Sequence, residues 1–532
     1  MRIKHLIASA LTSLLVLDCA GAYAFNPLGS LGDAFNTAAA GQQNTSQPQQ
    51  AALQPGTATA VGLSRGTALQ RQVVYEGYTK EMLPVKQLIA AGKDVDAIKE
   101  MQKRHPDKDA QDVLTHMELG LMSLLAGDLK AAQSGFEQAE REKVQKEERS
   151  TLGGFFSSIR DTAAGTISGN EELGEYTGPG FERVLLLNFK SVAYLLEGDR
   201  KAYNVTRRAI VLQNDEKKAF DEKIREAREE IAKKEKEQDK KGADLEKVGF
   251  DAVLEQQYRT TEKKAKKVPS AFVNPFGFYI AGLVQELDSY EDKSLRDNAR
   301  ISYEKALELN PKSSVIKGAV KALKRPAPQG RRLVHVIVGD GFAPEKKLLK
   351  FNLTMGLTNP IDIELPIYEP VPSRVARVEV QTSTGKRWAR LSEVADITAL
   401  ALRYQKDAGP LAQLRMMTTV IRNVIEGQAW NNVQQQAGLF GQIISSVKEQ
   451  RDEMAHPDMR SWSTLPSRLM AARFFVPKSV SRVKIVSYDK KGRVLASRIV
   501  DIDKNSHNFV YARAVDDTLY VSTSDKLWVA MR

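Results

Sequence analysis

The stretch from Leu119 to Ala139 constrains the fold more than any other part of the chain. It reads LGLMSLLAGDLKAAQSGFEQA, with apolar residues at helical spacing on both sides of a Gly-Asp pair. Gly127 in that pair predicts a tight turn between two helices. Gly120 and Ala132 are small enough to let the two antiparallel helices approach closely. We therefore expect a helix–turn–helix unit here.

The spacing of these residues is that of a tetratricopeptide (TPR) repeat. Phe136 falls where an aromatic side chain fills the wedge between neighbouring repeats, and Ala139 continues the small-residue pattern. One such unit cannot bury its apolar face alone, so the pattern predicts a stacked array that binds a partner and does not predict catalysis. A second recognisable unit lies between Ala271 and Ala322, with its packing positions at Gly282, Ala299, Tyr303 and Ala306.

Two weaker helix pairs extend the predicted array. Helical periodicity begins near Gln70 and is broken at Gly92, and a second helix ends before Pro106. Phe181 to Gln213 forms another pair, with its turn at Gly198. Together these units predict a TPR-like α-solenoid over residues 68–325.

The first 24 residues have the pattern of an export signal. A basic start precedes the apolar run Leu6–Leu17, which is too short to span a bilayer stably, and Ala22-Tyr23-Ala24 predicts cleavage after Ala24. Two alternatives stay open, a retained membrane anchor and a lipoprotein modified at Cys19, although Asp18 is not a usual residue before a lipidated cysteine. Cys19 is the only cysteine, so a cleaved chain contains no disulfide and no thiolate site.

The formal net charge of +12 favours an acidic partner, such as nucleic acid, anionic lipid or a cell-wall polymer. An export signal argues against nucleic acid. Basic and acidic residues are interleaved, as in Glu140-Arg141-Glu142-Lys143, so we expect most of the charge to lie on solvated helix faces.

Three segments differ in composition from the helical array. Residues 25–67 are rich in Gln, Ala, Ser, Thr and Pro and predict a disordered linker. Residues 151–180 are rich in Gly, Ser and Thr and predict a long loop. Residues 214–267 are strongly charged and predict a helical hairpin or long helix that projects from the body and breaks near Gly242. Their apolar seam is too short to favour a stable coiled coil.

Residues 331–532 form a second predicted domain that is rich in β-structure. A helical insertion is expected over 391–455. We interpret this part as a β-sandwich-like domain, so the expected fold class is multidomain α+β. The expected strands are Leu333–Val338, Leu348–Met355, Ile361–Ile367, Arg374–Gln381, Arg473–Val476, Ser481–Tyr488, Val494–Asp501 and Phe509–Tyr511.

Four segments carry a resemblance to a known family: Tyr176–Leu196, Ala299–Pro311, Val338–Lys346 and Arg460–Pro466. The chain resembles a family of exported proteins of Gram-negative bacteria, many of them lipoproteins, with TPR-like helices and a β-rich C-terminal part. No activity is attached to that family, so the resemblance implies a fold and a periplasmic location, with the outer membrane as an associated surface. The chain departs from it at Asp18-Cys19, where a clean lipidation site is expected.

No catalytic, cofactor-binding or metal-binding set stands out in the sequence. No phosphate-binding loop is present, and the histidines are not paired at metal-ligand spacing. Asn188, Lys190 and Tyr194 lie on the first helix of a repeat, the helix that lines a TPR groove, and are candidate partner-binding residues. Trp462 in the Arg460–Pro466 motif is a fourth candidate. For Tyr194 and Trp462 packing is the favoured alternative.

The sequence thus predicts a periplasmic, non-enzymatic scaffold or adaptor. Its helices would bind an envelope protein or peptide, and its β-rich domain would dock on a second envelope component near the membrane; nucleic acid and metal are not expected partners. Two alternatives are a lipid-anchored accessory subunit of a secretion or surface-fibre machine and a cell-wall enzyme.

Overall fold

One strand and a long run of helices precede a strand-rich part of the chain in the computed structural model, which describes residues 67–105, 112–151, 176, 178–239, 249–354, 361–434 and 457–523. Within these ranges the fold is mixed α+β, with antiparallel and mixed sheets. The described residues belong to one compact unit. The helices are α1 (Gly77–Glu81), α2 (Leu83–Ala90), α3 (Asp94–Arg104), α4 (Val113–Ala126), α5 (Leu129–Thr151), α7 (Gly180–Leu196), α8 (Lys201–Asp239), α9 (Phe250–Ala265), α10 (Pro275–Asp288), α11 (Leu295–Leu309), α12 (Ser314–Leu323), α13 (Ile397–Asp407) and α14 (Gly409–Gln434).

Small residues bring the helices of each pair into close contact. Gly127 ends α4 in the left-handed conformation, with φ of 77°, and α5 follows directly. A Cβ atom added at Gly120 would lie 2.8 Å from the Phe136 ring, so only glycine fits there. Gly282 on α10 faces Tyr303 on α11 in the same way, at 2.9 Å. The small and aromatic positions Ala132, Phe136, Ala139, Ala299, Tyr303 and Ala306 are all fully buried.

The strands form three sheets. Sheet A has the order β1-β3-β4, sheet B the order β12-β11-β2-β8-β7, and sheet C the order β10-β9-β5-β6. All pairs are antiparallel except β11 and β2, which are parallel. The strands are β1 (Thr67–Val74), β2 (Arg331–Asp340), β3 (Glu345–Thr354), β4 (Ile361–Glu369), β5 (Arg377–Gln381), β6 (Arg387–Arg390), β7 (Ser392–Asp396), β8 (Arg468–Pro477), β9 (Arg482–Tyr488), β10 (Val494–Asp501), β11 (Asn508–Val515) and β12 (Thr518–Thr523).

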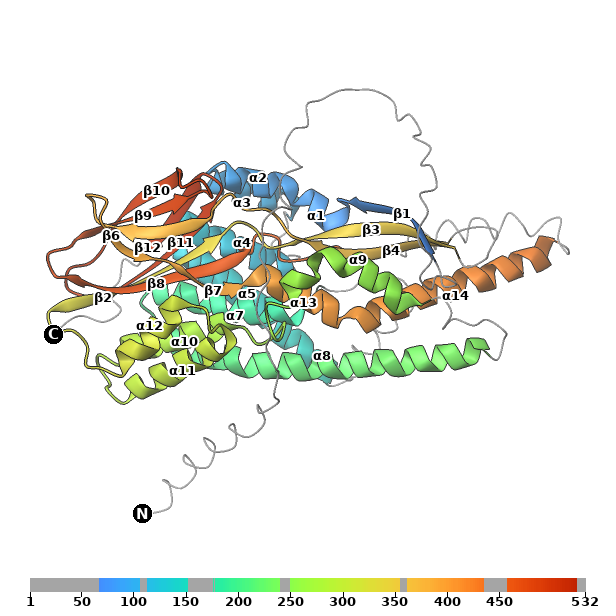
Figure 1. Cartoon of the computed structure of the whole chain (residues 1–532), viewed down its shortest axis with the longest axis horizontal. Coiled ribbons are helices and arrows are strands. Elements are labelled where there is room, and N and C mark those ends of the chain that lie inside the picture. The colour runs from blue at the N-terminus through green and yellow to red at the C-terminus, as the bar shows by residue number, and fades with distance from the viewer. Residues whose placement is uncertain are drawn as a thin grey trace, which may run out of the picture. The chain divides into compact units, whose positions relative to one another are not determined.

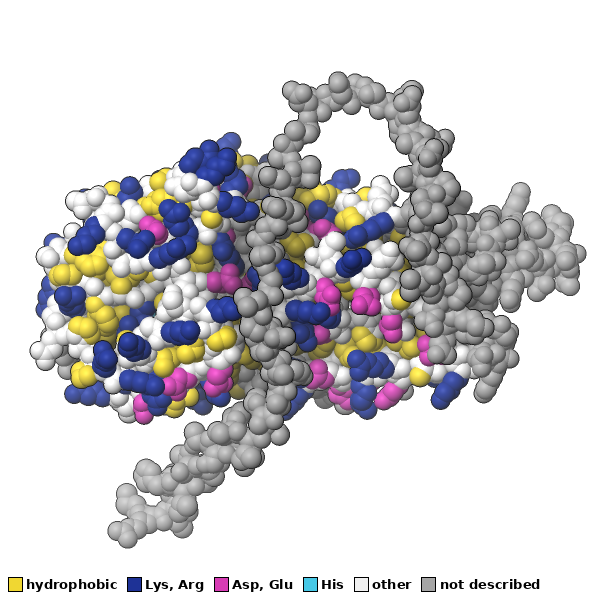
Figure 2. Space-filling model, in the orientation of Figure 1, with side chains coloured by type: hydrophobic (Ala, Val, Ile, Leu, Met, Phe, Trp, Pro, Cys, Tyr) yellow, Lys and Arg dark blue, Asp and Glu magenta, His cyan; other side chains and the backbone are white. Residues whose placement is uncertain are grey.

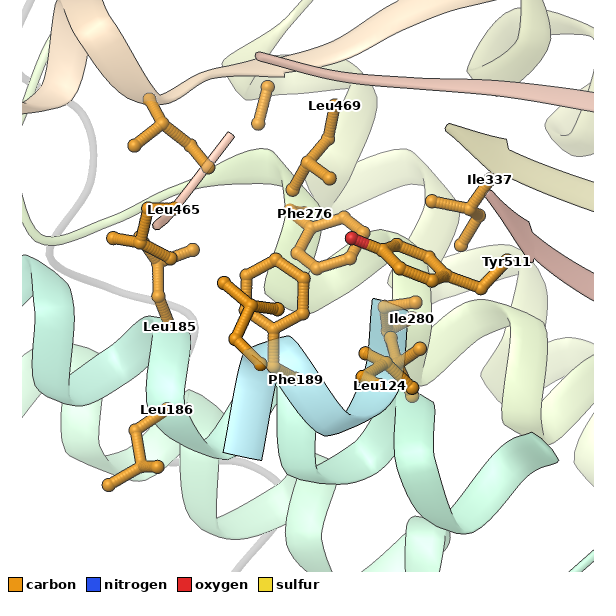
Figure 3. Packing of buried hydrophobic residues seen from close by; sticks show 14 of the residues in the cluster. Leu124, Leu185, Leu186, Phe189, Phe276, Ile280, Ile337, Leu465, Leu469 and Tyr511 are labelled. Atoms are coloured by element: carbon orange, nitrogen blue, oxygen red, sulfur yellow. The ribbon is translucent and has the colours of Figure 1, made fainter. Parts of the chain in front are cut away.

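Sheet B lies between sheet C and the helices. One of its faces shares a hydrophobic core with sheet C, to which Val336 and Ile485 belong. The opposite face packs on helices α4, α7 and α10 (Figure 1). In that second core the Phe189 ring of α7 lies 6.1 Å from Phe276 of α10 and 6.2 Å from Tyr511 of β11 (Figure 3). The helices and sheet B therefore share one continuous core.

Two predicted helices begin as strands instead. Residues 67–74 were expected to be linker and helix, but they form β1, which pairs with β3. The helical insertion expected from Leu391 begins with strand β7, which pairs with β8, and its first helix starts only at Ile397. Both strands are stabilised by pairing with segments far away in the sequence, which local periodicity does not report. Strands β6 and β12 were not predicted. Of the expected loop 151–180 only its two ends are described, and the expected helix at 437–447 lies outside the described residues.

Where the structure describes it, the charged segment 214–267 forms the end of α8 and the whole of α9, as its ion-pair spacing predicts, but α8 is packed on one side. The break expected near Gly242 lies outside the described residues. The short seam of α8 is buried at Phe220, Ile224, Ala227 and Ile231. Phe220 lies 4.9 Å from Phe272 and 5.2 Å from Tyr404, measured between ring centroids. This part of α8 therefore lies against the body and does not project freely into solvent.

Candidate functional site

A groove with a volume of about 630 Å³ opens between α8, α9, α13 and α14. Its floor is apolar and is formed by Ile231, Leu254 and Leu402, all of which are buried. Tyr258 of α9 stands on one wall, and burial raises the pKa of its phenol. An apolar floor with a few polar groups around it is the usual form of a ligand or peptide site.

Charged side chains line the rim of this groove. Asp251 and Glu255 on α9 are exposed and form no ion pair with any described residue. Acidic groups are in excess, which is the opposite of the chain's net charge of +12. The acidic side chains are Glu235, Asp251, Glu255 and Glu262, and the basic ones are Arg228 and Lys406.

Two ion pairs hold the walls of the groove together. Lys406 of α13 lies 3.0 Å from Glu262 of α9. Lys264 of α9 lies 2.7 Å from Asp396, the residue that caps the N-terminus of α13. Hydrogen bonds from Lys266 and Lys406 lower the pKa of Glu262 to about 2, so this carboxylate is charged at neutral pH. The groove is therefore a preformed feature of the fold.

A second group of polar residues is buried beneath the Arg460–Pro466 segment. The Glu118 carboxylate on α4 accepts the backbone N–H of Ser463 at 2.6 Å and that of Thr464 at 3.1 Å. Glu182 on α7 accepts the N–H of Trp462 at 3.2 Å. Both glutamates are almost completely inaccessible, with exposed fractions of 0 % and 1 %.

This burial changes the acid–base behaviour of both glutamates. It raises the pKa of Glu118 and the pKa of Glu182 to about 7, against the hydrogen bonds that lower them. Perturbed carboxyl groups in a cleft are candidates for catalysis. These two do not line the groove, and both accept hydrogen bonds from backbone N–H groups of segment 460–466, so their geometry favours holding a chain segment in place.

Three of the four segments that carry the family resemblance meet at this junction. Arg513 of β11 is fully buried and donates to the carbonyl oxygens of Thr464 at 2.8 Å and Gly341 at 2.5 Å. It thereby joins segment 460–466 to segment 338–346. Glu182, which belongs to segment 176–196, holds the same loop from the helix side. The motifs are therefore close in space although they are far apart in the sequence.

The predicted partner-binding residues are all buried. Lys190 forms an ion pair with Glu140 of α5 at 2.7 Å, and the Tyr194 hydroxyl donates to Glu137 of the same helix. The exposed fractions of Asn188, Lys190, Tyr194 and Trp462 are 1 %, 6 %, 3 % and 1 %.

Packing contacts account for these side chains. Of the α7 residues that were expected to line an open groove, Lys190 and Tyr194 contact α5, and Asn188 lies beside Gly277 of α10. Trp462 lies edge-on to Phe136 and Phe189, at 6.3 and 5.9 Å. The contacts favour the packing alternative, and a partner-binding role for these residues stays an untested prediction.

Sequence reasoning missed the groove. The seam of α8 was visible at Phe220 and Ile231, and Leu254 and Tyr258 have matching helical spacing on α9. These signals indicate that both helices bury a face, but they do not indicate what they pack against. The contribution of α13 and α14 is separated from α8 by about 150 residues and follows only from the fold.

Two other kinds of site are absent from the residues that the structure describes. Among those that the structure describes, no group of three His, Cys, Asp or Glu side chains is placed to hold a metal ion. No helix in the described part of the chain is long and apolar enough to cross a membrane.

Compared with models of protein families, with curated proteins and with solved structures, the chain matches none of them.

Proposed function

We propose that the protein is a non-catalytic adaptor that holds a Lys- or Arg-bearing peptide segment of a partner in the groove between α8, α9, α13 and α14. The groove is the observation that carries this proposal. Its apolar floor suits one or two aliphatic anchors, and its rim has four carboxylates and two cations. A basic amphipathic segment matches both properties.

The architecture supports an adaptor in a second way. The paired helices with small-residue seams at Gly120 and Gly282 are consistent with TPR-like repeats, and the core that sheets B and C share is consistent with a β-sandwich-like unit. We take the helical part as the TPR-like array that the sequence predicts. The proposed binding groove lies beside that array, on the charged helices.

Binding of a defined peptide tests the proposal. The probe is a fluorescein-labelled helical peptide of Leu, Ala and Lys, and the comparison peptide has Glu in place of every Lys. We expect fluorescence anisotropy to show binding of the Lys peptide only. Asp251→Lys with Glu255→Lys should weaken it at least tenfold, because the variant reverses two exposed rim charges.

A matched control separates local from overall charge. The control variant carries Asp215→Lys and Glu308→Lys, which change the net charge by the same amount at exposed positions that do not line the groove. It should leave the affinity for the Lys peptide within about twofold, because exposed charges further than a Debye length from the bound peptide are screened. Equal weakening by both variants, or equal binding of the two peptides, would contradict the proposal.

The proposed location is the periplasm, following export and cleavage after Ala24. The support for this is the leader pattern in residues 1–24. Mass spectrometry of the N-terminus of the purified protein tests it. A free Phe25 agrees with a periplasmic adaptor, whereas a diacylated Cys19 favours the lipid-anchored alternative.

A further inference from the structure

Sheet C and its hairpin loops hold most of the chain's excess positive charge. Residues 374–390 and 478–504, which include all four of its strands, contain 13 Lys or Arg and 4 Asp or Glu. This excess of nine positive charges compares with +12 for the whole chain. The charge is therefore concentrated on one element and is not spread over the helices.

The strand register shows which side chains point away from the core. Val483 and Ile485 on β9 belong to the core that sheet C shares with sheet B, so the residue between them faces outward. That residue, Lys484, belongs to a row of side chains that crosses all four strands on the outward face. The row consists of Ile499, Lys484, Gln381 and Arg387.

Few acidic groups neutralise this face. Glu379 is shared by Arg377 at 3.5 Å and Arg387 at 3.2 Å, so one carboxylate serves two guanidinium groups. Arg390 and Lys484 form no ion pair with any residue that the structure describes, and neither does Lys386 in the β5–β6 loop. A net positive charge therefore remains on the outward face.

Two aliphatic side chains are exposed beside these cations. Ile499 has an exposed fraction of 62 % and Val494 one of 58 %, and both are on the edge strand β10. Ile499 is the most exposed large apolar side chain among the described residues. Figure 2 shows Lys and Arg side chains gathered over the part of the molecule where Figure 1 draws β9 and β10.

We propose that the outward face of sheet C binds an anionic phospholipid surface, with its cations at the headgroups and Val494 and Ile499 in the interface. Basic residues with exposed aliphatic neighbours are the combination that peripheral membrane binding uses. The groove is not involved, so either proposal can fail without the other.

The aromatic side chains of this sheet argue against nucleic acid as the ligand. Single-stranded nucleic acid is bound on open aromatic faces. The Tyr488 ring is covered by the Arg377 guanidinium at 4.1 Å, and Trp388 stacks on Phe474 at 6.3 Å within the core between the sheets. The side chains left exposed on β10 are aliphatic.

Vesicle flotation tests the proposal with the chain that begins at Phe25, because the leader would itself bind lipid. The vesicles contain phosphatidylcholine with about 30 % phosphatidylglycerol, or phosphatidylcholine alone. We expect binding to the anionic vesicles only, and less binding as salt rises from about 0.1 to 0.5 M.

Two variants of sheet C and one control variant assign this binding to the sheet. The triple variant with Lys386→Gln, Arg390→Gln and Lys484→Gln should bind the anionic vesicles roughly a hundredfold more weakly, because each lost charge weakens binding roughly fivefold. Lys312→Gln, Lys317→Gln and Lys321→Gln remove the same charge from exposed positions at and near α12 and should leave binding within roughly twofold. Val494→Ser with Ile499→Ser should weaken binding without changing its salt dependence.

Three results would overturn the proposal. One is equal loss of vesicle binding in the two triple variants. Another is that the protein binds single-stranded DNA as tightly as vesicles and that Ile499→Ser does not change either affinity. This result would indicate a general polyanion surface. The third is no vesicle binding together with a dimer that Ile499→Ser dissociates, which indicates that a second copy covers the strand.

Discussion

Arg473 on β8 and Glu286 on α10 form a buried ion pair, with Arg473 Nε 2.9 Å from Glu286 Oε2. Glu286 is completely buried and also accepts a hydrogen bond from Tyr303 at 3.1 Å. Arg473 holds the pKa of this carboxyl well below its usual value against the opposing effect of burial. The pair joins strand β8 of sheet B to helix α10 of the helical layer.

Breaking this pair on one side should destabilise the protein strongly. Glu286→Leu or Arg473→Met alone should each lower the free energy of unfolding by about 3–5 kcal/mol, because the remaining charge is left buried without its partner. The double replacement should cost clearly less than the sum of the two. Urea denaturation measures all three, and an additive loss would show that the two side chains do not act as a pair.

Gly120 should not tolerate even a methyl group. Its Cβ would lie 2.8 Å from two ring carbons of Phe136, so Gly120→Ala should destabilise by about 1–3 kcal/mol through overpacking. Gly318→Ala on α12 is the matched control, because its Cβ would meet nothing within 4 Å. That change should stabilise the protein by about 0.4–1 kcal/mol. Chemical denaturation compares them, and effects of the same sign would contradict the close contact.

The docking of segment 460–466 on Glu118 should be measurable at two backbone amides. Glu118→Ala leaves the N–H groups of Ser463 and Thr464 buried without an acceptor, which costs about 1–3 kcal/mol for each. We expect faster hydrogen exchange in a peptide that spans this segment, beyond the loss in global stability. Glu308→Ala, at an exposed position, serves as the control. Unchanged exchange in the Glu118 variant would mean that the segment is held by other contacts.

His507 should make the fold less stable in mild acid. Burial lowers its pKa to about 4, while Nδ1 accepts the Leu333 N–H at 2.9 Å. The unfolded chain binds this proton below pH about 6.5 and the folded chain only below about 4, so stability falls as pH drops through this window. His507→Gln keeps an acceptor and does not titrate.

The pH test compares how the unfolding free energies of the wild type and of His507→Gln change with pH, because other groups titrate in the same range. Glu118 and Glu182, with pKa values raised to about 7, contribute in the opposite direction, because their protonated forms favour folding and stability is lost as pH rises through 7. The unfolding free energy of the wild type minus that of His507→Gln should therefore decrease from pH 6.5 to 4.5. A constant difference would place His507 in contact with water.

Local signals predicted the parts of the fold that depend on neighbours in the sequence. The turn at Gly127, the seam at Gly120 and Phe136, and strands such as β2 and β9 follow from spacing and side-chain size. The sequence did not reveal strand β1, because its partner β3 lies about 280 residues away. It also could not distinguish a solvated charged helix from one packed on Tyr404, since both have the same pattern of ion pairs.

The amino-acid sequence by itself determined the helix pairs, the position of most strands, and the concentration of charge in residues 374–390 and 478–504. Only the tertiary structure decided that Lys190 and Tyr194 are covered by α5, that Trp462 is a core residue, and that four helices enclose an acidic groove. The reason is physical: periodicity and capping act over a few residues, whereas burial depends on which surfaces meet, and the segments that meet here are separated by tens to hundreds of residues.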